Sequence, residues 1–183
     1  MSYLFGFGLL VVAGAVVVLF AMLGELYARS GGMEGAGAPG GGSGTVRLLD
    51  GARVGSRPER WPAGLAEVAT ADLRVVLVFS TSCNSCEKAA GEVGDLADTR
   101  DFALLISTID QERGEDFMTR HELAVLPHHI DVGGEWVAAE LGVMTSPSAL
   151  VFRHGRLVSA LLFTDLAALS AAVFPVKEAV GNE

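Results

Sequence analysis

The chain has 183 residues, of which 50% are hydrophobic, and its 22 acidic side chains outnumber its 13 basic ones, giving a net charge of −9. This negative charge excludes a protein that binds nucleic acid through its phosphates, because such binding needs a basic surface. The only cysteines are Cys83 and Cys86. They stand too close together to form a framework of structural disulfides, so they indicate a catalytic role rather than a structural one.

The N-terminal segment predicts a membrane anchor over residues 1–29. Leu4–Leu23 carries no charged side chain, and at 1.5 Å per residue a helix of this length spans about 30 Å, the thickness of the hydrocarbon core of a bilayer. A cleavable signal peptide is the alternative. It normally has a basic start and a shorter apolar core, whereas residues 1–3 contain no Lys or Arg. A retained transmembrane helix is therefore favoured.

A flexible linker is predicted at residues 30–44, because more than half of these residues are glycine. Such a segment cannot bury apolar surface, and its root-mean-square reach is about 20 Å. From Thr45 onward the composition is that of a globular protein. Residues 45–183 are long enough for a single domain with its own core.

The first strongly patterned stretch of this domain contains the two cysteines. Val75–Phe79 is a short apolar run rich in β-branched residues, which predicts a strand buried on both faces. Ser80–Ser82 ends the strand, and Cys83 and Cys86 follow. Apolar residues then recur at helical spacing as far as Ala97. The cysteines are therefore expected between a central strand and the first turn of a helix.

This placement favours redox chemistry at the Cys83–Cys86 pair. A helix N-terminus presents free N–H groups and a partial positive charge, which stabilise a thiolate and lower the pKa of a cysteine. Half of a zinc site is the alternative for a CxxC pair. Zinc needs four ligands, and the chain has no further cysteine.

The other elements alternate between strands and helices, as in an α/β domain. Further strands are predicted near Val46–Leu49 and at Phe102–Thr108, His128–Val132, Ser148–Phe152 and Leu157–Phe163. Helical segments are predicted around Leu65–Ala69, at Gly114–Leu123 and Glu135–Leu141, and after Asp165, which is expected to cap the last helix.

A second motif stands directly before the strand at Ser148. The sequence Thr145-Ser146-Pro147, followed by a strand, is similar to the cis-proline loop of the thioredoxin superfamily, and the strand–CxxC–helix phrase resembles the same superfamily. The fold class that this implies is α/β, thioredoxin-like, with a helix–strand insertion and one N-terminal transmembrane helix. The insertion, the anchor and the phrase around the cysteines resemble the membrane-tethered thiol–disulfide oxidoreductases of the TlpA/ResA type. Among these, the methylamine dehydrogenase maturation proteins MauD look most similar, over roughly residues 70–174.

The resemblance implies a role for each residue of the two motifs. Cys83 would attack a client disulfide and Cys86 would resolve the mixed disulfide. A cis bond before Pro147 would turn the backbone of Ser146 toward the dithiol, where an extended client segment can pair with it. The implied partners are client protein thiols or disulfides and an unidentified upstream redox partner. No dissociable cofactor and no metal are implied.

The resemblance also implies a single-pass protein of the bacterial cell membrane with an extracytoplasmic catalytic domain. The nearest basic residue after the anchor is Arg29. By the positive-inside rule it favours the opposite orientation, with the domain in the cytoplasm.

The chain departs from the thioredoxin pattern at several positions. Ser82 replaces the usual Trp before the first cysteine, and Asn84-Ser85 replaces Gly-Pro. Leu77 stands where a buried acid commonly assists proton transfer. Glu87 is the nearest acid in sequence, and we interpret it as a solvated residue that favours the helix dipole.

Two alternatives from other classes stay open. A peroxidase of the peroxiredoxin type shares the fold, but Val76 stands where its motif has proline. A tethered assembly factor could hold clients at Ser146-Pro147 without catalysis. Copper delivery through His128-His129 is disfavoured, because neighbouring residues of a strand point to opposite faces.

Overall fold

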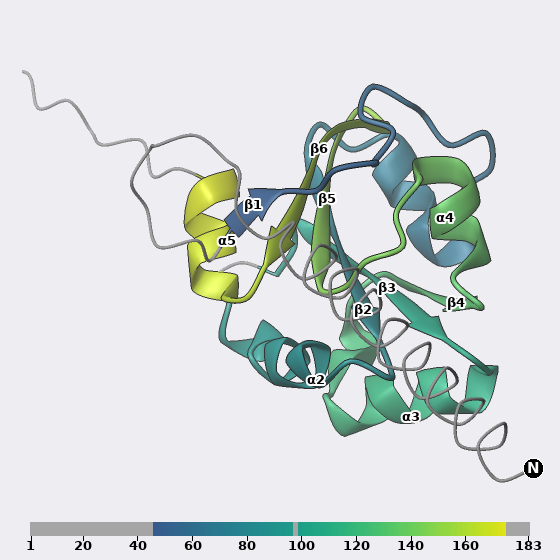
Figure 1. Ribbon diagram of the computed structural model, residues 1–183, viewed down its shortest axis with the longest axis vertical. Coiled ribbons are helices and arrows are strands. Elements are labelled where there is room, and N and C mark those ends of the chain that lie inside the picture. The colour runs from purple at the N-terminus through teal and green to yellow at the C-terminus, as the bar shows by residue number, and fades with distance from the viewer. Residues whose placement is uncertain (1–45, 97–98, 175–183) are drawn as a thin grey trace, which may run out of the picture. The chain divides into compact units, whose positions relative to one another are not determined.

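Strand β2 (Arg74–Ser80) lies in the middle of a six-stranded sheet in the computed structural model (Figure 1). The structure describes residues 46–96 and 99–174, and these belong to one unit of the chain, Ser43–Glu183. The predicted anchor and linker lie outside the described residues. Within the described ranges, no helix has the length and apolar character needed to cross a membrane.

The sheet combines a parallel half with an antiparallel half. Its strand order is β1-β6-β5-β2-β3-β4. The other strands are β1 (Val46–Leu48), β3 (Phe102–Thr108), β4 (His128–Val132), β5 (Ser148–Arg153) and β6 (Arg156–Phe163). Strand β3 runs parallel to both β2 and β4, whereas β5 is antiparallel to β2 and to β6, and β1 is antiparallel to β6.

The interior of β2 is buried on both faces, as its apolar sequence predicts. In register, Leu77 lies between Leu104 of β3 and Ala149 of β5. Because successive side chains of a strand alternate in direction, β2 contributes to two separate cores. Leu77 and Phe79 belong to one core, and Val76 and Val78 to the other.

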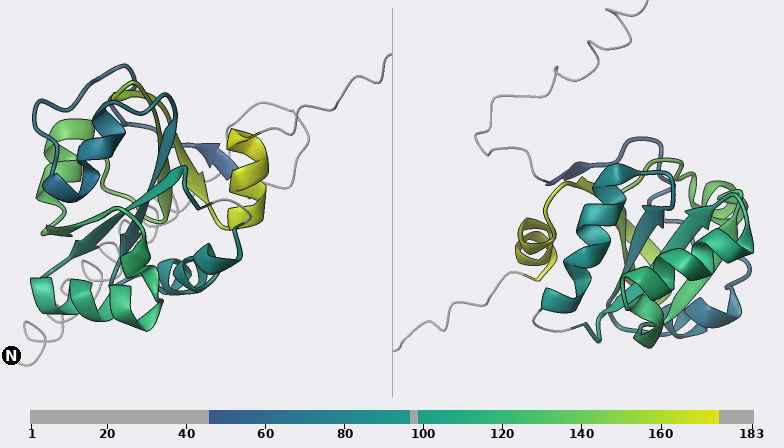
Figure 2. Two further views of the ribbon diagram at one scale, coloured as in Figure 1. Left: turned by 180° about the vertical axis from the view of Figure 1, so that it is seen from behind. Right: turned by 90° about the horizontal axis from the view of Figure 1, so that it is seen from below.

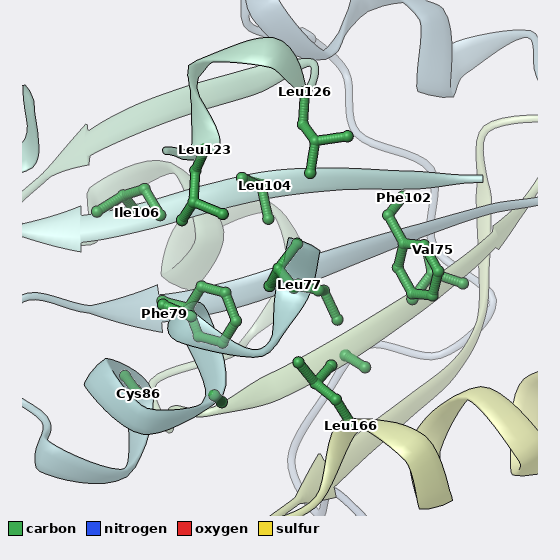
Figure 3. Packing of buried hydrophobic residues seen from close by; sticks show 14 of the residues in the cluster. Val75, Leu77, Phe79, Cys86, Phe102, Leu104, Ile106, Leu123, Leu126 and Leu166 are labelled. Atoms are coloured by element: carbon green, nitrogen blue, oxygen red, sulfur yellow. The ribbon is translucent and has the colours of Figure 1, made fainter. Parts of the chain in front are cut away.

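Helices cover both faces of the sheet (Figure 2). Apolar residues of α2 (Asn84–Gly91), α3 (Gln111–Arg120) and α5 (Leu166–Val173) pack in the first core. Residues of the 3-10 helix η1 (Ala63–Ala69) and of α4 (Glu135–Leu141) pack in the second. Figure 3 shows Leu77, Phe79 and Cys86 gathered in the first core, which ties the dithiol helix to the central strand.

This arrangement is the thioredoxin-like fold, because β2-α2-β3 and the β5-β6 hairpin with α5 surround a mixed sheet in the corresponding order. Helix α3 and strand β4 follow the second parallel strand, β3, and lie before the hairpin in the sequence, where an additional helix and strand were predicted. The predicted strands at Phe102–Thr108 and His128–Val132 and the predicted helix at Glu135–Leu141 are confirmed without a shift of their ends.

Two predicted helices have different ends in the structure. The helix that follows the cysteines was expected to continue to Ala97, but α2 ends at Gly91 and a 3-10 turn, η2 (Val93–Asp95), follows. Gly91 and Gly94 account for this, because glycine in a helix interior costs about 1 kcal/mol relative to alanine.

The helix predicted at Gly114–Leu123 begins and ends three residues earlier. It begins after Asp110, whose carboxylate accepts a hydrogen bond from the N–H of Arg113 at 2.9 Å. It ends at Arg120 because Glu122 adopts a left-handed backbone conformation with φ 56°. A 3-10 turn, η3 (Leu123–Val125), then leads into β4.

Candidate active site

The dithiol lies where β2 gives way to α2, as the sequence predicts. Cys83 is the N-cap of α2, and its sulfur accepts a hydrogen bond from the backbone N–H of Cys86 at 3.3 Å. The carbonyl oxygen of Cys83 accepts hydrogen bonds from the N–H groups of Cys86 and Glu87, at 3.0 and 3.1 Å. The first cysteine therefore opens the helix and the second completes its first turn.

The environment of Cys83 favours its thiolate. The side chain is half-buried, and this burial alone would raise the pKa of the thiol. Hydrogen bonds from the Cys86 side chain, the Ser85 hydroxyl and the Cys86 backbone N–H outweigh it and lower the pKa of Cys83 below its ordinary value. The Ser85 oxygen lies 3.4 Å from the Cys83 sulfur.

The environment of Cys86 has the opposite effect. Its side chain is 0% exposed, and this burial, together with the hydrogen bond and the negative charge of the neighbouring Cys83, raises the pKa of Cys86 to about 12. The two cysteines, both free in this structure, are thus chemically unequal. Cys83 is accessible and ready to ionise, whereas Cys86 is buried and protonated.

The loop at Ser146-Pro147 faces the dithiol. The peptide bond between these residues is cis, as expected from the motif. The carbonyl oxygen of Ser146 lies 3.7 Å from the sulfur of Cys83. The fold therefore brings together two motifs that are 63 positions apart in the sequence.

Hydroxyl side chains fill the segment between the end of β2 and Cys83. Ser80 and Ser82 contact each other through their side-chain oxygens at 3.0 Å, and the hydroxyl of Thr81 donates to that of Thr108 at 3.2 Å. The sequence pattern marks Ser80, Ser82 and Ser85 as the end of the strand or as departures from the thioredoxin pattern, and it predicts no function for their hydroxyl groups. The available signal was the run of Ser and Thr that begins where the apolar strand ends.

No carboxylate lies buried beneath the dithiol in the described part of the chain. Leu77, at the position of the acid that is common in thioredoxins, is 0% exposed and belongs to the apolar core. The one buried carboxylate among the described residues is Asp131. It accepts hydrogen bonds from the N–H groups of Trp136 and Val137, at 3.0 and 2.9 Å, and so serves as the cap of α4.

Glu87 lies in the first turn of α2, as predicted, but its carboxylate is also paired with two basic side chains that the sequence did not indicate. One of its carboxylate oxygens lies 2.7 Å from the guanidinium of Arg120, and the other lies 2.6 Å from Nε2 of His121. Partial burial opposes the charge of Glu87, but these hydrogen bonds and charges outweigh it and lower the pKa of the carboxyl. The cluster joins α2 to the end of α3. The sequence carries no signal for it, because the partners are 33 and 34 positions away.

The two neighbouring histidines of β4 do not form a metal site with other described residues. Nδ1 of His128 lies 2.8 Å from the carbonyl oxygen of Leu126, and the His129 ring contacts Trp136 with centroids 6.3 Å apart. Within the described ranges, no group of three or more His, Cys, Asp or Glu side chains could hold a metal ion.

No protein-family model and no curated protein matches the chain. Among solved structures, it is similar to a secreted disulfide oxidoreductase of Mycobacterium tuberculosis homologous to E. coli DsbE, at 16% identity and a TM-score of 0.46 over 58% of this chain and 84% of that chain. It is also similar to a DsbF homologue from Corynebacterium diphtheriae, at 18% identity and a TM-score of 0.47 over 75% of this chain and 96% of that chain.

At such low identities, the strand order and the position of the dithiol define the class of protein. A thioredoxin-like domain with a CxxC dithiol at the start of the helix that follows the central strand has the arrangement of a thiol–disulfide oxidoreductase.

Proposed function

We propose that this protein exchanges disulfides with client proteins, with Cys83 as the nucleophile and Cys86 as the resolving thiol. One observation carries the proposal. The Cys83 sulfur caps α2 and accepts a hydrogen bond from the Cys86 N–H, while the Cys86 side chain is fully buried directly behind it. This asymmetry provides one thiol that can attack a client disulfide and a second that can later resolve the mixed disulfide.

The exchange proceeds in two balanced steps. The Cys83 thiolate attacks one sulfur of a client disulfide, the client S–S bond breaks, and the other client sulfur leaves as a thiolate. Cys86 then loses its proton, and its sulfur attacks Cys83 in the mixed disulfide. This closes the Cys83–Cys86 disulfide and releases the second client thiolate. Two electrons pass to the client, and an upstream dithiol would restore the starting state.

The first step itself prepares the second. The hydrogen bond and the charge of Cys83 are among the causes that raise the pKa of Cys86. Once Cys83 is held in a mixed disulfide it carries no charge, so this contribution disappears and Cys86 ionises more easily. A buried acid is not required for this effect, which fits the presence of Leu77 beneath the dithiol.

The test is reduction of a protein disulfide by the reduced full-length protein in mild detergent. Wild type should reduce the disulfide, and Cys83→Ser should not. If wild type instead consumes hydrogen peroxide and leaves protein disulfides intact, the protein is a peroxidase. If a variant that lacks both cysteines still supports client assembly in cells, the protein is an assembly factor.

We further propose that the protein is tethered to the bacterial cell membrane by a helix at Leu4–Leu23, with its redox domain outside the cytoplasm. The uncharged apolar run and the resemblance to TlpA/ResA proteins support this. The resemblance to MauD makes enzyme maturation the first client class to test. The full-length protein should resist alkaline extraction from membranes, and externally added protease should degrade its domain in spheroplasts. Recovery of the uncut protein in the soluble fraction would contradict the tether.

A further inference from the structure

Two cavities of different character adjoin Ser146 of the cis-proline loop. A cavity of about 330 Å³ and a smaller one of about 150 Å³ share Thr145 and Ser146 as lining residues. The Ser146 carbonyl oxygen is also the group that lies 3.7 Å from the Cys83 sulfur. A client segment that pairs with the backbone of Ser146 and presents its sulfur to Cys83 can therefore place its flanking side chains near both cavities.

The larger cavity is uncharged. Its polar lining comes from hydroxyl groups, among them Ser80 and Ser107, and from the backbone at Gly133-Gly134. Apolar side chains such as Val78 and Val137 line the rest, and none of the residues that line this cavity is charged. Placing a charged client side chain here would remove it from water without a compensating partner. This cavity fits an uncharged side chain.

The smaller cavity is lined by a positively charged side chain. Arg47 lines it together with Pro147 and residues of the end of β6. Arg47 is exposed on β1, where it pairs with Leu162 of β6 through the backbone register. Its guanidinium makes no ion pair or hydrogen bond with any other residue in the described ranges. In a chain with net charge −9, this places an available positive charge in a cavity that also borders Ser146, whose carbonyl oxygen lies near the Cys83 sulfur.

We propose that the client segments of this protein carry an acidic side chain on the flank of the cysteine that faces Arg47, and an uncharged side chain on the other flank. The inference rests on the proposed disulfide exchange and deepens it by naming the substrate class. A guanidinium is well suited to bind a carboxylate, because its N–H groups can engage both oxygens.

The experiment compares peptide disulfides that differ only beside the cysteine. Each peptide is a symmetric disulfide dimer with Glu, Gln or Lys on one side of its cysteine or on the other. The reduced full-length protein in mild detergent converts one dimer into two peptide thiols as its own dithiol becomes a disulfide. The rate of peptide thiol release is measured at low and high ionic strength.

Two matched charge reversals distinguish a local effect from a general one. Arg47→Glu changes the cavity, whereas Arg153→Glu makes the same change on an exposed residue at the opposite end of β5 from Ser148. On the flank that faces Arg47, the wild-type protein should react with the Glu peptide roughly two- to five-fold faster than with the Lys peptide at low salt. This preference should fade at high salt. Arg47→Glu should reverse this preference, and Arg153→Glu should leave it unchanged. On the other flank, Gln should react faster than both Glu and Lys.

The inference is overturned if Arg47→Glu keeps the wild-type preference, or if Arg153→Glu shifts it equally. It is also overturned if the second flank accepts either charge as well as Gln. The Gln peptides separate this inference from the proposal on which it rests. If the protein reduces the Gln, Glu and Lys peptides equally well, only this inference is contradicted. If it reduces none of the peptides, the proposed disulfide exchange is contradicted as well.

Discussion

The backbone N–H of Cys86 donates a hydrogen bond to the sulfur of Cys83 at 3.3 Å, so a cysteine occupies a position where helices usually carry Ser, Thr, Asp or Asn. A thiolate accepts this hydrogen bond more strongly than a neutral thiol does. The same contact therefore caps α2 and favours ionisation of Cys83.

Selective alkylation tests this difference between the thiols. With limiting iodoacetamide below pH 7, Cys83 should be labelled first, because its pKa is lowered while that of Cys86 is raised to about 12. After allowance for the weaker nucleophilicity of a low-pKa thiolate, the preference should be roughly 50-fold or more. Peptide mapping after the reaction gives the ratio, and the unfolded protein serves as the control. Faster labelling of Cys86 in the native protein would reverse the assigned roles.

Removal of the resolving thiol should trap clients. Cys86→Ser should accumulate mixed disulfides between Cys83 and client proteins in cells, because the second displacement cannot occur. These complexes should appear on non-reducing gels and disappear with reductant, and Cys83→Ser should form none. Mass spectrometry of the trapped proteins would identify the clients. Equal trapping by the two variants would show that Cys83 is not the unique attacking thiol.

The Glu87 cluster predicts a pH-dependent contribution to stability. Because the folded-state pKa of Glu87 is lowered, its stabilisation is present above the ordinary carboxyl value of 4.5 and is lost as the pH falls through the folded-state pKa. Its side chain is 35% exposed, so solvent screening limits the effect. Glu87→Gln should lower the free energy of unfolding by about 0.5–1 kcal/mol at pH 7.

Urea denaturation of wild type and Glu87→Gln at several pH values measures the contribution of the Glu87 cluster to the free energy of unfolding. The difference between the two proteins should shrink at acidic pH. Glu92→Gln is a matched control on the same segment, since the one ion pair of Glu92 among the described residues is with the exposed Lys88 at 3.9 Å. This substitution should cost a few tenths of a kcal/mol at most. A Glu87→Gln difference that persists unchanged at pH 3 would argue against an ion-pair origin.

We expect Asp131 to contribute more to the free energy of unfolding than Glu87 does. It is 3% exposed, and its carboxylate receives two backbone N–H groups of α4. Asp131→Ala leaves both donors unsatisfied and should cost about 2–3 kcal/mol of unfolding free energy. Glu135→Ala removes an exposed carboxylate from the first turn of the same helix and should change stability by less than about 0.5 kcal/mol. Similar losses in the two variants, measured by urea denaturation, would show that Asp131 is not the cap.

The parts of the fold that were predictable from sequence are those governed by local pattern. The apolar run at Val75–Phe79 and the polar break after it place the central strand and the dithiol. Asp165 caps the last helix as expected, with its carboxylate 2.7 Å from the N–H of Ala168. The early end of α2 was missed because its apolar spacing continues past two glycines.

The contacts that define the chemistry were less accessible to sequence reasoning. The Glu87 cluster and the position of Arg47 beside Pro147 depend on segments that meet only after folding. The unequal thiols could be anticipated from their order at the start of a helix. The size of the pKa difference between Cys83 and Cys86 depends on the complete burial of Cys86. The sequence pattern around the cysteines does not reveal this burial.

The packing of Gly64 in η1 against His128 of β4 has a consequence for encounters with unfolded clients. A Cβ atom at Gly64 would lie 1.7 Å from the His128 carbonyl oxygen, so η1 presses closely against this outer strand of the sheet. The opposite border is β1, which spans 3 residues within the described part of the chain. Sheet borders that are covered or very short are poor templates for aggregation. The domain can therefore offer the backbone of Ser146 to an extended chain while giving that chain little opportunity to attach itself to the rest of the sheet.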